Sequence, residues 1–93
     1  MAANKLTFYE GEKREVTSTV TSRNSKEAVV IASAEYELRK VLNNSIVQTG
    51  SGEIEGNEVT VLLDFIEKGS YELKVTSYVG REKIIAKTLI DIE

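Results

Sequence analysis

The sequence alternates most strictly over residues 71–78, Tyr71-Glu72-Leu73-Lys74-Val75-Thr76-Ser77-Tyr78. Apolar or small side chains occupy every second position, and charged or polar side chains mostly fill the positions between them. Because successive side chains of a β-strand point to opposite faces, this period predicts a half-buried strand. Val79-Gly80-Arg81 then predicts a turn.

The same pattern recurs along the chain. Residues 15–21 predict one strand, residues 29–41 a second, and residues 46–55 a weaker one. The last predicted strand, residues 84–92, carries apolar side chains on both faces. Ile84 and Ile90 share one face, whereas Ile85 and Leu89 occupy the other.

A tight hairpin is expected at Gly56-Asn57, since glycine accepts the positive φ at the first position of a type II′ turn. Its register would pair residues on the core face as follows: Ile54 with Val59, Gly52 with Val61, and Gly50 with Leu63. A slip of one residue would expose the apolar face of residues 58–64, so this register should be well specified.

The inward positions of these strands define the expected core. It comprises Val16, Val20, Ala34, Tyr36, Leu38, Ile54, Val59, Val61, Leu63, Leu73, Val75, Ile84, Ile90 and Ile92. Six or seven short strands without a convincing helix predict a single all-β domain, residues 1–93, folded as a two-sheet antiparallel sandwich. A small barrel of the OB type is the alternative.

Composition limits the chemistry. The 93 residues include no cysteine and no histidine, which removes a thiol nucleophile, the usual general base and the commonest metal ligand. We therefore expect no enzyme, no catalytic residue, no cofactor and no metal. A calcium site at a sandwich end, formed from Asp64, Glu67, Asp91 or Glu93, is the minority alternative.

Charge and hydropathy bear on partners and location. The formal charge of −3 is unsuited to a phosphate backbone or an anionic membrane, so neither nucleic acid nor membrane is expected as a partner. The first residues lack the charged and apolar regions of a secretory signal, and no apolar run approaches the length that spans a bilayer. A cytoplasmic site of synthesis is expected.

The segment Gly69-Ser70-Tyr71-Glu72-Leu73 resembles the tyrosine corner of immunoglobulin-like sandwiches. The resemblance implies that the Tyr71 hydroxyl bonds to the backbone before its strand. It also implies that Leu73 faces the core where antibody domains have a cysteine. Gly69, Tyr71 and Leu73 are the expected structural corner of an immunoglobulin-like sandwich of about seven strands.

Four segments are similar to short immunoglobulin-like proteins of tailed phages and prophages, including the N-terminal domains of baseplate upper proteins. They are Tyr9-Glu10-Gly11-Glu12-Lys13-Arg14, Ile31-Ala32-Ser33-Ala34-Glu35-Tyr36-Glu37-Leu38, Gly52-Glu53-Ile54-Glu55-Gly56-Asn57 and Gly69-Ser70-Tyr71-Glu72-Leu73-Lys74-Val75. The resemblance implies a structural or protein-interaction module of a virion, in the tail, the baseplate or the head-neck region. A carbohydrate- or ligand-binding sandwich of a bacterial protein is the alternative.

Protein partners are therefore expected, either further copies of the chain or other virion proteins. The candidate interface residues are apolar or aromatic side chains at predicted outward or terminal positions, namely Phe8, Tyr9, Tyr78, Ile85 and Leu89. Phe8 and Tyr9 could equally close the sandwich.

Overall fold

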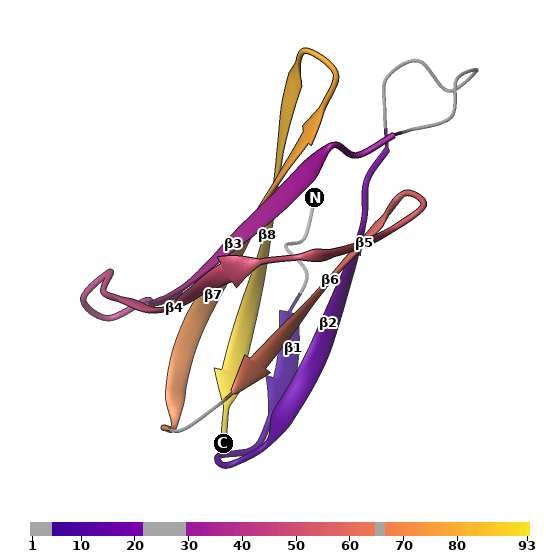
Figure 1. Ribbon diagram of the computed structural model, residues 1–93. Coiled ribbons are helices and arrows are strands. Elements are labelled where there is room, and N and C mark those ends of the chain that lie inside the picture. The colour runs from indigo at the N-terminus through magenta and orange to yellow at the C-terminus, as the bar shows by residue number, and fades with distance from the viewer. Residues whose placement is uncertain (1–4, 22–29, 65–66) are drawn as a thin grey trace.

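The computed structural model describes residues 5–21, 30–64 and 67–93, which fold into two β-sheets packed face to face (Figure 1). Its strands are β1 (Lys5–Phe8), β2 (Lys13–Thr19), β3 (Ser33–Lys40), β4 (Ile46–Ser51), β5 (Glu53–Glu55), β6 (Glu58–Asp64), β7 (Gly69–Val79) and β8 (Glu82–Ile92). One sheet has the order β1-β8-β7-β3-β4 and the other β2-β6-β5. Among the described residues, no helix is long and apolar enough to cross a membrane.

The predicted sandwich is confirmed, because the strands form two separate sheets rather than one closed barrel. The OB-type alternative is therefore wrong. Two details differ from the prediction: the described residues form eight strands, and β1 pairs with β8 in parallel, with Leu6 opposite Ile90. Four residues are too few for β1 to show the alternation that marks the longer strands.

The predicted pairing of residues 50–55 is correct at only one end. Ile54 lies opposite Val59, and Gly56 has the positive φ of 61° that the turn requires. Gly50, however, pairs with Tyr36 rather than with Leu63. The chain leaves the larger sheet at Gly52, so one predicted strand serves both sheets as β4 and β5.

Gly52 allows this crossing because it has no side chain. Its N–H donates to the Ala34 carbonyl oxygen at 3.0 Å, which keeps it in the larger sheet and excludes the predicted pairing with Val61. A Cβ on Gly52 would lie 2.4 Å from Cγ1 of Val59, well inside contact distance. The backbone therefore passes directly over a buried valine of the smaller sheet.

The core lies between the sheets and agrees with the prediction at most positions. The predicted residues that are buried are Val16, Val20, Ala34, Tyr36, Leu38, Val59, Val61, Leu63, Leu73, Val75, Ile90 and Ile92. Ile84 is only partly buried, because β1 flanks β8 only from Leu89 onward and this part of β8 has a described strand on one side alone. Ile54 is exposed, since the short β5 lies at the edge of the smaller sheet. Phe8, Ile31 and Tyr71 complete the core.

The structural corner has the geometry that the resemblance implies. The Tyr71 hydroxyl donates to the Glu67 carbonyl oxygen at 3.0 Å, and Tyr71 itself is buried. Gly69 begins β7 with a φ of 145°. Leu73, two residues after the tyrosine, is completely buried and faces the smaller sheet.

Candidate interaction surface

The outer face, defined as the side of the larger sheet that points away from β2, β5 and β6, carries two exposed aliphatic side chains on β8. Ile85 is 47% exposed and Leu89 is 38% exposed. Ile85 lies opposite Thr76 of β7, and Leu89 lies opposite Glu72. Their direction agrees with the sequence analysis, and no described segment of the chain covers them.

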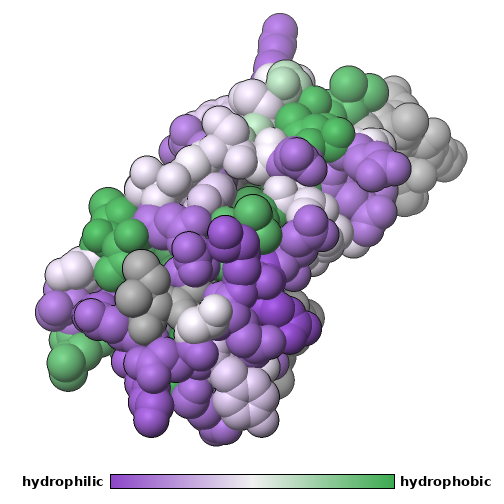
Figure 2. Space-filling view, turned by 60° about the horizontal axis from the view of Figure 1, so that its bottom comes forward, coloured by the Kyte–Doolittle hydropathy of each residue, from purple (hydrophilic) through white to green (hydrophobic). Residues whose placement is uncertain are grey.

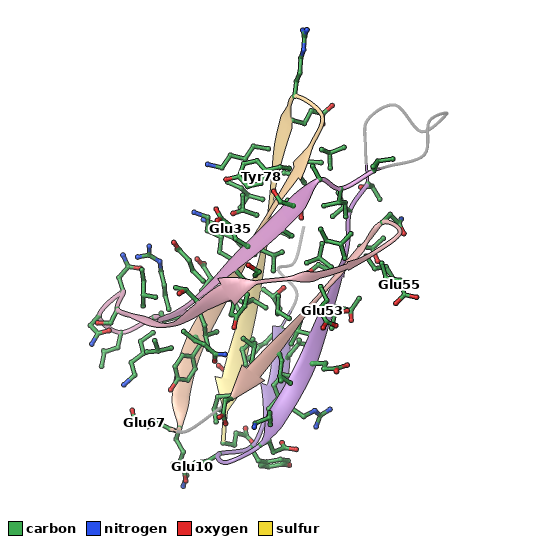
Figure 3. All side chains as sticks on the ribbon, viewed as in Figure 1. Glu10, Glu35, Glu53, Glu55, Glu67 and Tyr78 are labelled. Atoms are coloured by element: carbon green, nitrogen blue, oxygen red, sulfur yellow. The ribbon has the colours of Figure 1, made fainter. Side chains whose placement is uncertain are left out.

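Tyr78 lies on the same outer face near the end of β7, with Ser33 on one side and Lys83 on the other. Its hydroxyl donates to the Glu35 carboxylate at 3.1 Å, and Figure 3 shows the two side chains meeting across β7 and β3. The adjacent carboxylate raises the pKa of Tyr78 above its usual value. The ring is thus held in place, with its hydroxyl protonated at neutral pH.

A groove of about 480 Å³ crosses the outer face beside this tyrosine. It has a predominantly polar wall, to which Glu35, Glu37, Thr49, Ser51, Lys74 and Lys83 contribute. The groove lies between the apolar residues of β8 and the edge strand β4. The outer face therefore carries two exposed apolar side chains, with Lys87 between them on β8, beside a polar and charged groove.

Phe8 and Tyr9 have different environments in the structure, although they are adjacent in the sequence. Phe8 is 8% exposed and belongs to the core, and the guanidinium of Arg14 lies 4.7 Å from its ring centroid. It closes the sandwich, so its placement does not support a role as an interface residue. Tyr9 is exposed, but it follows β1 at the opposite end of the sheet from Tyr78 (Figure 1).

The β3–β4 hairpin is an exposed apolar region that the sequence analysis missed. Val41, Leu42, Ile46 and Val47 are all exposed, and Leu42 is 94% exposed. Figure 2 shows apolar surface on its left side, where this hairpin projects. A signal was available in the sequence, because Val41-Leu42 directly precedes Asn43-Asn44, a residue pair typical of turns.

Two acidic side chains of the calcium alternative are engaged with lysines. Asp91 accepts from Lys5 Nζ and Glu67 from Lys40 Nζ, each at 2.8 Å. These contacts lower the pKa of both carboxyl groups. Within the described ranges, no group of three or more acidic residues is arranged to hold a metal ion.

No family model matches the chain, and no curated protein matches it. Among solved structures, it is similar to the crystal structure of an engineered protein, with a TM-score of 0.73 and 11% sequence identity. The match covers 96% of this chain and 18% of that chain, so this chain spans less than a fifth of the engineered protein. At that identity the likeness shows the fold alone, an all-β sandwich.

Proposed function

We propose that this chain is a non-enzymatic structural module that binds protein through the outer face of its larger sheet. The observation that carries the proposal is the exposure of Ile85 and Leu89 on one face of β8. On the opposite face of that strand, Ile90 and Ile92 are buried in the core. Both outward side chains keep more than a third of their area in water, and a partner would remove this area from water.

The surroundings of these side chains have the chemistry of an interface. Complete burial of an aliphatic side chain contributes roughly 1.5 to 3 kcal/mol, and both residues have exposed area left to bury. Lys87 lies between them on the same face of β8, opposite Lys74 of β7, so a partner that covers both apolar side chains would also have to pair these two cations. Tyr78, held by Glu35, is a preorganised aromatic anchor that loses little freedom on binding.

The absence of an enzymatic activity is part of the proposal. The sequence contains neither cysteine nor histidine, so nucleophilic and acid–base chemistry would rest on carboxylates, lysines and the hydroxyl groups of serine, threonine and tyrosine. Among these, Asp91 and Glu67 have depressed pKa values, which favours the charged form and disfavours a role as a general acid at neutral pH.

A place in a phage or prophage virion is the more specific form of the proposal. It is supported by the sequence resemblance of residues 9–14, 31–38, 52–57 and 69–75 to short immunoglobulin-like phage proteins. Inspection of the neighbouring genes tests it. Capsid, connector or tail genes would support a virion component, whereas sugar-processing genes would favour the carbohydrate-binding alternative.

The binding surface is tested by serine substitution. The double variant Ile85→Ser/Leu89→Ser should lose co-purification with its partner, either the chain itself or the product of a neighbouring gene. Leu62→Ser is the matched control, because Leu62 is 51% exposed on the outer side of β6, in the other sheet. Equal binding by both variants would contradict the assignment of the outer face.

A further inference from the structure

The edge strands of the sandwich differ in how they are protected. β1 and β4 are the edges of the larger sheet, and β2 and β5 are those of the smaller one. Natural proteins protect such edges with charged residues, proline or short strands, because open backbone groups pair with other chains. Here β1, β2 and β5 each carry charged residues, as does the part of β8 beyond β1, where Glu82, Lys83 and Lys87 lie.

Only β4 lacks this protection among the described edges. Its sequence, Ile46-Val47-Gln48-Thr49-Gly50-Ser51, contains neither a charged residue nor a proline. Ile46 and Val47 are also 49% and 46% exposed. A shift of register between Leu38 and Arg39 leaves Val47 as an extra residue, so the regular part of the edge is residues 48–51.

The hydrogen bonds between β3 and β4 show which N–H and C=O groups of β4 point away from the sheet. Gly52 donates to Ala34, and residues of an antiparallel strand direct their N–H and C=O alternately to the two sides. Gly50 and Gln48 therefore face β3, as Gly52 does. Thr49 and Ser51 direct their N–H and C=O groups away from β3, toward a side where no described strand lies.

We propose that a second copy of this chain pairs with β4 in an antiparallel arrangement across a two-fold axis, joining the two larger sheets into one. With the axis at Gly50, Thr49 of each copy lies opposite Ser51 of the other. Each of these two residue pairs can then exchange both N–H···O=C bonds. Such an interface uses the same surface on both copies and closes upon itself.

The charged residues at the two ends of β4 favour a second copy of this chain as the partner. Arg39 and Lys40 end β3 beside the start of β4. Glu53 and Glu55, labelled in Figure 3, follow its other end. An antiparallel two-fold places the basic end of one copy next to the acidic end of the other. Arg39 and Lys40 each have one carboxylate partner already, but both cationic groups have further donors.

The paired segment would be short, because Val47 is an extra residue at one end and the chain leaves the larger sheet at Gly52 at the other. Ile46 and Ile54 flank this segment and are 49% and 39% exposed. Each copy would therefore bring apolar side chains to the two ends of the interface. The inference concerns the sheet edge and is independent of the proposed use of the outer face.

Sedimentation velocity on the purified chain between about 1 µM and about 1 mM tests the pairing. The chain should form dimers as its concentration rises. Thr49→Pro should raise the dimer dissociation constant by about tenfold or more, because it removes an outward N–H from both copies at once. The fold should survive, since that N–H does not bond to β3.

Thr17→Pro is the matched control. Val20 donates to Asn57, so the same alternation directs the Thr17 N–H away from β6, on an edge that already carries charge. This variant should dimerise like the parent. If Thr49→Pro does not fold, Thr49→Lys tests the same edge by adding a charge.

Amide hydrogen exchange gives a residue-level readout. The amides of Thr49 and Ser51 should exchange slowly at high protein concentration and rapidly at low concentration, whereas the amide of Thr17 should be unaffected. A parent chain that stays monomeric throughout the range would overturn the proposal. So would dimers that persist unchanged in Thr49→Pro or Thr49→Lys.

Discussion

Replacement of Gly52 by alanine should destabilise the fold at the point where the chain crosses between the sheets. The new Cβ would lie 2.4 Å from Cγ1 of Val59, whereas an ordinary contact is at least 3.4 Å. Val59 is fully buried and β-branched, so it cannot rotate away without displacing its neighbours. Overpacking of this kind typically costs 1 to 3 kcal/mol, from which the usual gain for Gly→Ala of roughly 0.4 to 1 kcal/mol is subtracted.

We therefore expect a net loss of about 1 to 2 kcal/mol in the free energy of unfolding, seen as a lower urea midpoint. Ser51→Ala, one residue earlier on the exposed edge, should leave the midpoint nearly unchanged. Val59→Ala removes the methyl group that clashes, so it should cost less in the Gly52→Ala background than in the parent. Strict additivity of the two changes in a double-mutant cycle would refute the clash.

Three further predictions concern the corner, the core and pH. Tyr71→Phe removes the 3.0 Å bond to the Glu67 carbonyl oxygen and should cost roughly 0.5 to 1.5 kcal/mol in a chemical denaturation experiment; an unchanged midpoint would contradict the corner. Leu73→Ala empties a fully buried position and should cost roughly 2 to 5 kcal/mol; a smaller loss than that of the exposed Leu62→Ala would contradict the packing. Lys5 lowers the pKa of Asp91 in the folded protein. The contact should therefore stabilise the fold above about pH 4, the pKa of an aspartate in the unfolded chain. This stabilisation should be lost as the pH falls through the lower pKa that Asp91 has in the folded state. Asp91→Asn should then be less stable than the parent at pH 7, and the difference should shrink at low pH; a difference independent of pH would contradict the contact.

Local alternation was sufficient to predict most of the core. Residues such as Leu73 and Val61 lie in strands long enough to show which face is apolar, and both are buried. Ile54 shows the limit of that signal. It alternates correctly with its neighbours, yet β5 lies at a sheet edge, and no local pattern tells an edge strand from a central one.

The sheet switch at Gly52 was not predictable for the same reason. The hairpin at Gly56 sets the pairing of Ile54 with Val59, and simple extension of that register leads to Gly50 opposite Leu63. The competing partner, β3, is distant in sequence, and pairing with it depends on the packing of the whole sandwich. Phe8 illustrates a related gap, because its burial depends on the parallel pairing of β1 with β8.

The candidate surface was predicted only in part. The outward direction of Ile85 and Leu89 follows directly from the two-residue period of β8. The bond between Tyr78 and Glu35 does not, since it joins strands 43 residues apart in the sequence. The exposed hairpin at Val41 and Leu42 was missed, because a turn signal indicates where the chain reverses and not whether its flanks are covered.

A photo-reactive amino acid placed at position 85 shows whether the outer face contacts another protein in the cell. The variant chain is irradiated in the cells that produce it, and its covalent adducts are identified by mass spectrometry. We expect a defined protein adduct from position 85 that is not obtained from the same probe at position 62, on the other sheet. The absence of a protein adduct at position 85, or the same adducts from both positions, would contradict the claim that the outer face binds protein.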